Sequence, residues 1–175
     1  HYPLRRQRQM CIRDRMLTER LNSGYFNSQH CSKQWRSFIQ VFVEEIYQTA
    51  GDEDARAFLR HMGTRLAAMH PVPLYDSIEE LEKSMNLILS SMDWGWVKIE
   101  MHDLSLVFYH GAFPLPSYGK KEAEREALVF SALLEGLYHG WMVALGGNPE
   151  IAVRTQKAIP GQIFELVYAK LTRNY

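Results

Sequence analysis

Cysteine is scarce in this chain of 175 residues, which contains only Cys11 and Cys31. The sequence also lacks the run of about 7–15 apolar residues behind a basic start that a secretory signal requires. No segment is repeated, and no linker is long enough to divide the chain. We therefore expect no framework of disulfides and no export through a secretory signal.

Motifs that carry common catalytic chemistry are also missing. There is no GxSxG, GxxxxGK or GxGxxG segment, and none of the seven histidines is followed by another four residues later. The acidic pairs Glu44–Glu45 and Glu79–Glu80 are neighbours on predicted helices, so their carboxylates point in different directions and do not suit a glycosidase. We expect no enzymatic activity, no catalytic residue, no metal site and no cofactor.

The first fifteen residues differ in composition from the rest of the chain. They hold five arginines and one aspartate, and the segment QMCIRDR is similar to a translated sequencing adapter, so we interpret residues 1–15 as a non-native tract. Residues 16–175 then contain 15 basic and 19 acidic residues, a net charge of −4. Because binding to phosphates requires a basic face, nucleic acid is not an expected partner.

Apolar periodicity begins after a polar arm at residues 16–31. Ser32 and Asp52 are candidate N-caps for helices over 32–51 and 52–69, separated near Gly51. Ser77, with a glutamate three residues later, forms a capping box for a third helix, which ends before Gly95. Helical spacing of apolar residues therefore predicts three helices in the first half of the domain.

The period changes from 3.6 to 2 at Trp96, which predicts a hairpin over residues 96–109 that turns at Asp103. A long helix is expected over 121–145, ended by two glycines, and a second hairpin over 151–158 and 162–171. The predicted fold is therefore a single α+β domain, with helices packed on antiparallel β-hairpins in the order α-α-α-β-β-α-β-β.

Small residues recur every fourth position along one side of the long helix, at Ala132, Gly136, Gly140 and Ala144. Two glycines inside a helix cost about 0.5–1 kcal/mol each, which close contact with another backbone would offset. The partner is left open between a sheet, another helix and a second copy; we predict an oligomer interface here. Glu135 near the middle of this helix argues against a membrane-spanning segment.

Aromatic side chains near the start of the domain are candidates for binding sugars. Tyr25, Phe26 and Trp35 lie at or before the first predicted helix, outside the dense periodic pattern of the core. Such rings stack on the apolar faces of sugars, but they also fill cores and interfaces, so the residues alone leave both roles open.

Three segments resemble the cellulose synthase D family, whose members are accessory proteins of bacterial cellulose operons. They are the run from Phe38 to Gly51 with Leu59, Arg60, Gly63 and Ala67; the block SIEELEKSMNLILSSMDWGWVKIE over 77–100; and ALLEGLYHGW over 132–141. The resemblance covers most of residues 35–145, so residues 32–175 are interpreted as a domain similar to this family.

The resemblance implies a non-enzymatic role in bacterial cellulose biosynthesis. Members of the family are described as closed octameric rings that guide β-1,4-glucan chains and promote their export and ordered crystallisation. By this resemblance Tyr25, Phe26 and Trp35 are candidate glucan-binding residues, and the partners are further copies of the chain, the glucan, the cellulose synthase complex and other operon proteins. We expect a cytoplasmic location at the inner-membrane complex, with the periplasm as the alternative.

A second interpretation follows from the predicted order of elements. That order is similar to four-vinyl-reductase-type and transport-particle-type domains, which bind small ligands or serve as dimeric scaffolds. It implies an apolar pocket enclosed by the hairpins and the long helix, although a likeness of fold says little about function.

Overall fold

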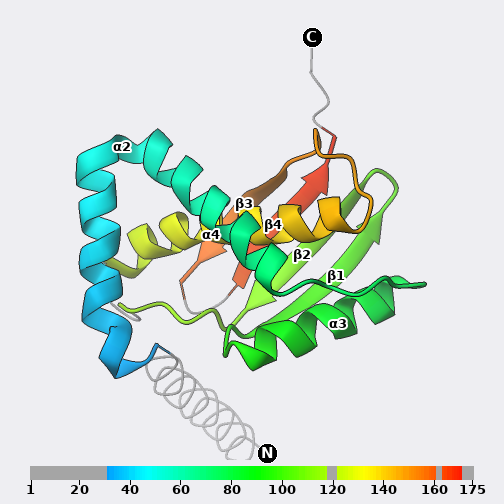
Figure 1. Ribbon diagram of the computed structural model, residues 1–175, viewed down its shortest axis with the longest axis horizontal. Coiled ribbons are helices and arrows are strands. Elements are labelled where there is room, and N and C mark those ends of the chain that lie inside the picture. The colour runs from blue at the N-terminus through cyan, green and yellow to red at the C-terminus, as the bar shows by residue number, and fades with distance from the viewer. Residues whose placement is uncertain (1–30, 118–121, 161–162, 171–175) are drawn as a thin grey trace, which may run out of the picture.

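The computed structural model describes residues 31–117, 122–160 and 163–170. Within these residues the chain forms helices α2, α3 and α4 and strands β1 to β4 (Figure 1). The helices span Lys33–Met69, Ile78–Ser91 and Glu122–Ala144, and the strands span Trp96–His102, Ser105–Gly111, Val153–Ile159 and Ile163–Ala169. The predicted α+β fold and the predicted order of elements are confirmed.

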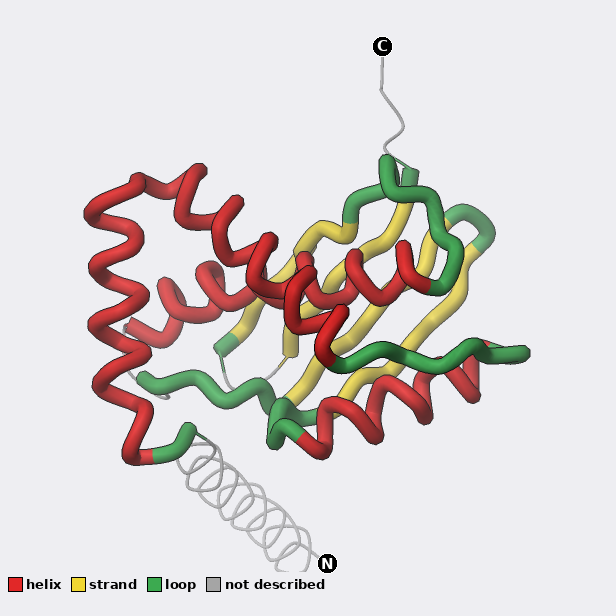
Figure 2. The backbone as a smooth tube through the Cα atoms, in the orientation of Figure 1, coloured by secondary structure: helices red, strands yellow, loops and turns green. Residues whose placement is uncertain are grey.

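The four strands form one antiparallel sheet in the order β1-β2-β4-β3. Strand β1 pairs with β2 and β3 pairs with β4, each within its own hairpin. The two hairpins join where β2 pairs with β4, with Phe108 opposite Leu166. Figure 2 shows the helices gathered on one side of this sheet. Because side chains alternate between the faces of a strand, the face under the helices carries the buried residues Val97, Ile99, Phe108, Phe164 and Leu166.

Helix α2 contains a break at the position where the sequence predicts two helices. Gly51 has φ 80° and ψ 171°, which is outside the helical region and in a range that glycine adopts readily. The half before the break packs Val43 against Leu59, Val129 and Ala132, and the half after it lies along α4. Ser32 occupies the predicted N-cap, but its side chain makes no capping hydrogen bond.

The capping box of α3 forms with one change of partner. The Ser77 hydroxyl accepts from the Glu80 amide at 3.2 Å, as the spacing predicts. The Glu80 carboxylate accepts from the Asp76 amide at 3.0 Å, one residue before the N-cap. At the far end of α4, Gly146 has φ 90° and provides the predicted left-handed C-cap.

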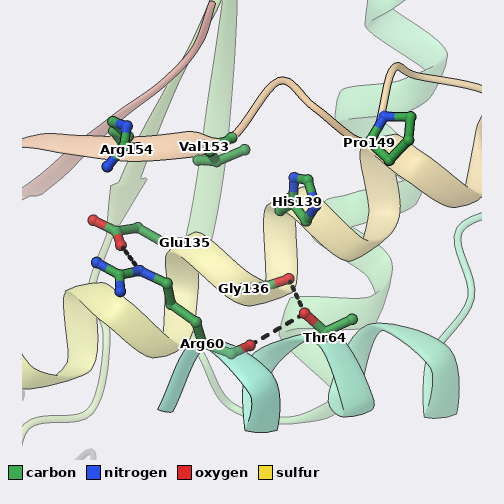
Figure 3. A pocket seen from close by; sticks show the side chains of 9 residues that line it. Arg60, Thr64, Glu135, Gly136, His139, Pro149, Val153 and Arg154 are labelled. Atoms are coloured by element: carbon green, nitrogen blue, oxygen red, sulfur yellow. Dashed lines mark hydrogen bonds and ion pairs between the residues drawn. The ribbon is translucent and has the colours of Figure 1, made fainter. Parts of the chain in front are cut away.

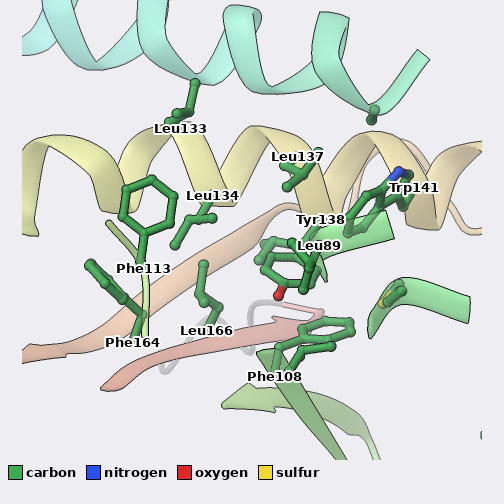
Figure 4. Packing of buried hydrophobic residues seen from close by; sticks show 14 of the residues in the cluster. Leu89, Phe108, Phe113, Leu133, Leu134, Leu137, Tyr138, Trp141, Phe164 and Leu166 are labelled. Atoms are coloured by element: carbon green, nitrogen blue, oxygen red, sulfur yellow. The ribbon is translucent and has the colours of Figure 1, made fainter. Parts of the chain in front are cut away.

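Helix α4 is the centre of the core, between α2 and the sheet. Its side chains meet the sheet in a packed layer in which Tyr138 stacks on Phe108 with ring centroids 4.7 Å apart (Figure 4). Leu134, Tyr138 and Leu166 have no exposed surface. Where Leu134 and Tyr138 meet Phe108 and Leu166, these side chains fill the space between α4 and the sheet.

Among the described helices, α4 alone is long and apolar enough to cross a membrane. In the fold, 72% of its most apolar window is buried inside the protein. Its apolar surface is therefore used in contacts with α2 and the sheet.

The end of the first hairpin differs from the alternation that the sequence predicts. The alternating pattern places Met101 and Leu104 on the covered face, yet they are 71% and 88% exposed. The cause is geometric. The turn between β1 and β2 extends beyond the first residues of α3, and no described element covers it (Figure 1).

The small-residue stripe meets another helix of the same chain. A β-carbon added to Gly136 would overlap the Arg60 carbonyl oxygen of α2, and one added to Gly63 of α2 would overlap the Leu133 carbonyl oxygen of α4. A β-carbon on Gly140 would lie 2.7 Å from the Ala67 β-carbon. Each helix thus contributes a glycine to one close contact between backbones.

The contact with α2 occupies most of the surface at which we predicted an oligomer interface. Ala132 and Gly136 are buried within the chain, and Gly140 faces α2, whereas Ala144 alone of the four is exposed. With α2 in this position, the first three residues are not available to a second copy. The sequence pattern identified a close contact but could not identify its partner.

His110 is a buried histidine that holds the hairpin to the core. Its Nε2 donates to the Trp94 carbonyl oxygen at 2.8 Å, so Nδ1 is the acceptor for the Tyr138 hydroxyl at 2.7 Å. Burial lowers the pKa of His110 to about 4 and raises the pKa of Tyr138 well above its ordinary value. Both groups are therefore neutral at physiological pH.

The close helix contact predicts a graded response to alanine. Helix propensity alone would make Gly136→Ala stabilising by about 1 kcal/mol. Because the new methyl group would overlap backbone, we expect instead a loss of about 3 kcal/mol in the free energy of unfolding. Gly140→Ala should lower the free energy of unfolding by less, since its new methyl group meets the Ala67 side chain instead of backbone. Ala144→Ser, at an exposed position, should change the free energy of unfolding by less than about 0.5 kcal/mol. Chemical denaturation measures all three, and equal effects would contradict the contact.

His110 predicts a loss of stability in mild acid. As the pH falls below 6.5, the unfolded state takes up a proton that the folded state, with a pKa of about 4, does not. The free energy of unfolding should therefore be unaffected by this histidine above pH 6.5 and should fall by about 3 kcal/mol as the pH drops from 6.5 to 4. His110→Gln should lower stability at neutral pH but flatten the dependence in this window. If the free energy of unfolding fell equally steeply with pH in wild type and in His110→Gln, His110 would not be the group responsible.

Candidate functional site

Trp35 lies in the first turn of α2 and is 54% exposed. It begins a row of exposed apolar side chains on the first half of that helix, which we call the α2 row and which consists of Trp35, Phe38 and Val41. Trp35 meets Phe38 edge to face at 5.7 Å, and Phe38 stacks on Phe42 at 6.2 Å. Because residues three apart on a helix are neighbours, each member of the row lies beside the next.

A cavity of about 310 Å³, which we call the Trp35 pocket, opens beside this row. Trp94, Phe113 and Phe130 contribute aromatic walls, and Asp93 contributes a carboxylate. Trp94 and Phe113 meet edge to face at 5.2 Å. Aromatic faces combined with a few polar groups suit ligands that are apolar on one side and hydroxylated on the other, as sugar rings are.

The pocket also contains Cys31, the first described residue. Burial raises the pKa of the Cys31 thiol, so the sulfur is held in its protonated form. Because the thiolate is the nucleophilic form, this cysteine is poorly suited to covalent chemistry. Its place in the wall of the pocket is a packing role.

The other two predicted glucan-binding residues, Tyr25 and Phe26, lie outside the described residues. Of the predicted set, only Trp35 lies within the described residues. Its side chain lies at the surface beside a cavity. The neighbours Asp93, Trp94 and Phe113 come from the end of α3 and the end of the first hairpin, which are distant in sequence. The periodic apolar residues around Trp94 predict a place in the core, so no sequence pattern linked it to Trp35.

Two buried carboxylates on α4 have structural hydrogen bonds rather than catalytic partners. Glu126 accepts from the backbone amide of Ser117 at 2.8 Å and from its hydroxyl at 2.6 Å, and so fixes the segment that follows β2. That hydroxyl also accepts from the Gln40 side-chain amide of α2. No motif pointed to Glu126; a charged residue within a strongly apolar helix is the signal that could have identified it.

Glu135, the second buried carboxylate, joins three elements. It forms an ion pair with Arg60 at 2.7 Å (Figure 3) and another with Arg56 at 3.4 Å, both on α2, and accepts from the Thr155 amide of β3 at 3.0 Å. In the described part of the chain, no three His, Cys, Asp or Glu side chains gather as a metal site would require. The acidic pairs Glu44–Glu45 and Glu79–Glu80 lie at the surface of their helices.

Comparison with known proteins identifies the family. The sequence model of the family described as the D subunit of cellulose synthase matches residues 21–169. The chain is also 30% identical over 112 residues to Cellulose synthase operon protein D of Komagataeibacter xylinus, an alignment that covers 63% of this chain and 70% of the relative. The protein of the same description from Komagataeibacter sucrofermentans matches with the same identity and coverage. The resemblance seen in the sequence is thereby confirmed, and the chain belongs to the cellulose synthase D family.

Proposed function

We propose that this protein is a non-enzymatic accessory subunit of bacterial cellulose biosynthesis, which assembles with copies of itself and guides β-1,4-glucan chains toward export and ordered crystallisation. The observation that carries the proposal is the family match over residues 21–169, which supports a role in cellulose synthesis. The arrangement of the described acidic residues agrees with a non-catalytic role, because the buried carboxylates of Glu126 and Glu135 are occupied by structural hydrogen bonds.

Self-association is supported by the α2 row. Trp35, Phe38 and Val41 are 54%, 60% and 57% exposed, and they lie on a half-helix that projects beyond the edge of the sheet (Figure 1). Contiguous exposed apolar residues on one helix are typical of an interface between proteins. We propose a closed homo-oligomer, in the form of an octameric ring, in which Phe38 and Val41 of this row contact another copy and the indole face of Trp35 stays accessible.

Glucan contact is supported by the Trp35 pocket. A β-1,4-glucan presents flat, apolar ring faces edged by hydroxyl groups, which match an indole face and a nearby carboxylate. Trp35 provides the exposed face, and Asp93 provides an acceptor at the rim. In this proposal the pocket holds a sugar ring without changing it.

The protein would act beside the membrane-embedded synthase and other products of the operon. The names of its relatives as operon proteins support this partnership. We place it on the cytoplasmic side of the inner membrane, with the periplasm as the alternative. Fractionation of cells that carry a tagged copy distinguishes the two compartments.

The function as a whole is tested by removing the gene. Cellulose yield or crystalline order should fall, while the rate of glucan synthesis per synthase stays nearly constant. A deletion that stops synthesis itself would assign the protein to catalysis, and a deletion with no effect on cellulose would refute the proposal.

Replacing Phe38 tests the role of the α2 row in assembly. Light scattering of the purified protein should give a mass that is a multiple of the 20.4 kDa chain. Phe38→Asp should weaken association by at least about tenfold, because a charge would be buried at the contact. Leu87→Asp is the matched control, since Leu87 is 66% exposed on α3, and it should leave the mass unchanged. A wild-type protein that stays monomeric at micromolar concentration would refute self-assembly.

Replacing Trp35 tests the glucan contact separately. Trp35→Ala should weaken binding of cellohexaose by about tenfold through loss of the stacking face, whereas Trp35→Phe should retain part of the affinity. Leu87→Ala removes an exposed apolar side chain elsewhere and should leave affinity unchanged. The mass of each variant is measured alongside, so that a loss of sugar binding in an intact oligomer is distinguished from disassembly. Equal affinity for wild type and Trp35→Ala would remove Trp35 from the site.

A further inference from the structure

A second cavity of about 310 Å³ lies between α2, α4 and β3, away from the Trp35 pocket. Arg60 and Thr64 of α2, Glu135 and His139 of α4, and Arg154 of β3 contribute to its lining (Figure 3). Two arginines and a carboxylate line it, in contrast with the aromatic walls around Trp35. The proposed function does not use this cavity.

Glu135 holds Arg60 in a fixed position at the cavity. The carboxylate, which is 5% exposed, accepts from Nε of Arg60 at 2.7 Å. A guanidinium group has five N–H donors, and this contact uses the one on Nε. Within the part of the chain that the structure describes, both terminal nitrogens of Arg60 form no hydrogen bond, so they can donate to a ligand while Nε stays on Glu135.

Arg56 neutralises Glu135 from the other side. Its Nη2 lies 3.4 Å from Oε1 of Glu135, and its Nη1 donates to the Leu128 carbonyl oxygen at 2.9 Å. The Thr155 amide donates to the same carboxylate at 3.0 Å. The negative charge of Glu135 is therefore satisfied without any contribution from Arg154.

Arg154 leaves the cavity with excess positive charge. It lies on the edge strand β3, and its side chain has no hydrogen bond or ion pair within residues 31–117, 122–160 and 163–170. The charged side chains that line the cavity, Arg60, Arg154 and Glu135, carry a net charge of +1, and Arg56, which does not line it, pairs with Glu135 as well. His139 donates through Nδ1 to the Ile151 carbonyl oxygen at 3.2 Å, which fixes its ring in the cavity wall.

We propose that this cavity binds a phosphate group, either free or as a phosphate ester. Two guanidinium groups from different elements line one cavity, and their forked donors match the oxygens of a tetrahedral anion. Because Arg56 also pairs with Glu135, the positive charges of Arg60 and Arg154 exceed the negative charge at the cavity and favour an anion. The phosphate accepts hydrogen bonds from Arg60 and Arg154, while Glu135 positions Arg60 and does not touch the anion.

A purely structural role would require fewer charges. One arginine suffices to neutralise a buried carboxylate, and Glu135 already has two. Arg154 does not take part in that network and is exposed, so its removal should not affect folding. This makes Arg154 the residue that separates anion binding from packing.

The test is a calorimetric titration of the purified full chain with pyrophosphate. Wild type should bind, and Arg154→Ala should weaken binding by at least about tenfold, as expected for loss of a charge-assisted contact. Lys157→Ala is the matched control, because Lys157 is exposed on the same strand, does not line the cavity and carries the same charge. Its affinity should stay within about twofold of wild type. Circular dichroism confirms that both variants fold.

Two further arms identify the source of the phosphate. Vesicles of phosphatidylglycerol and vesicles of phosphatidylcholine are sedimented with wild type and with Arg154→Ala. Sedimentation that requires both the anionic lipid and Arg154 assigns the site to a lipid headgroup, whereas binding of pyrophosphate alone assigns it to a soluble ligand. Absence of all binding, or equal losses for Arg154→Ala and Lys157→Ala, would overturn the proposal. Neither result depends on glucan binding at Trp35.

Discussion

The contact between the backbones of α2 and α4 determines the position of nearly every other feature. Gly63 and Gly136 each lack the atom that would separate the helices. The resulting close approach brings Arg56 and Arg60 within reach of Glu135, and Glu135 in turn reaches the β3 amide of Thr155. A separation larger by one methyl group would disrupt both the helix pair and the link to the sheet.

Local patterns in the sequence were sufficient to predict the elements. The change of apolar period at Trp96, the capping box at Ser77 and the glycines at 51 and 146 correspond to observed boundaries or turns. These signals succeed because each depends on a few neighbouring residues and on backbone geometry that the residue type itself restricts. The resemblance to the cellulose synthase D proteins added the family, which no local pattern contains.

Contacts between distant segments were not predictable in the same way. The small-residue stripe revealed that a backbone approaches α4, but not that it belongs to α2 about 70 residues earlier. Trp94 and Asp93 join Trp35 only because α3 and the first hairpin bring them there. Met101 and Leu104 follow the strand pattern yet are exposed, since coverage depends on the length of the neighbouring helix. Sequence periodicity describes one element at a time, whereas a site requires several.

Side chains of α3 occupy the outer edge of β1. The Asn86 amide both donates to the Val97 carbonyl oxygen and accepts from the Val97 amide at 2.8 Å, and Glu82 accepts from the Ile99 amide at 2.8 Å. An open strand edge is a template for pairing with a strand of another molecule, and here those backbone groups are already satisfied. A strand of another molecule therefore cannot pair with this part of β1 without first displacing α3, which protects this edge from uncontrolled β-aggregation.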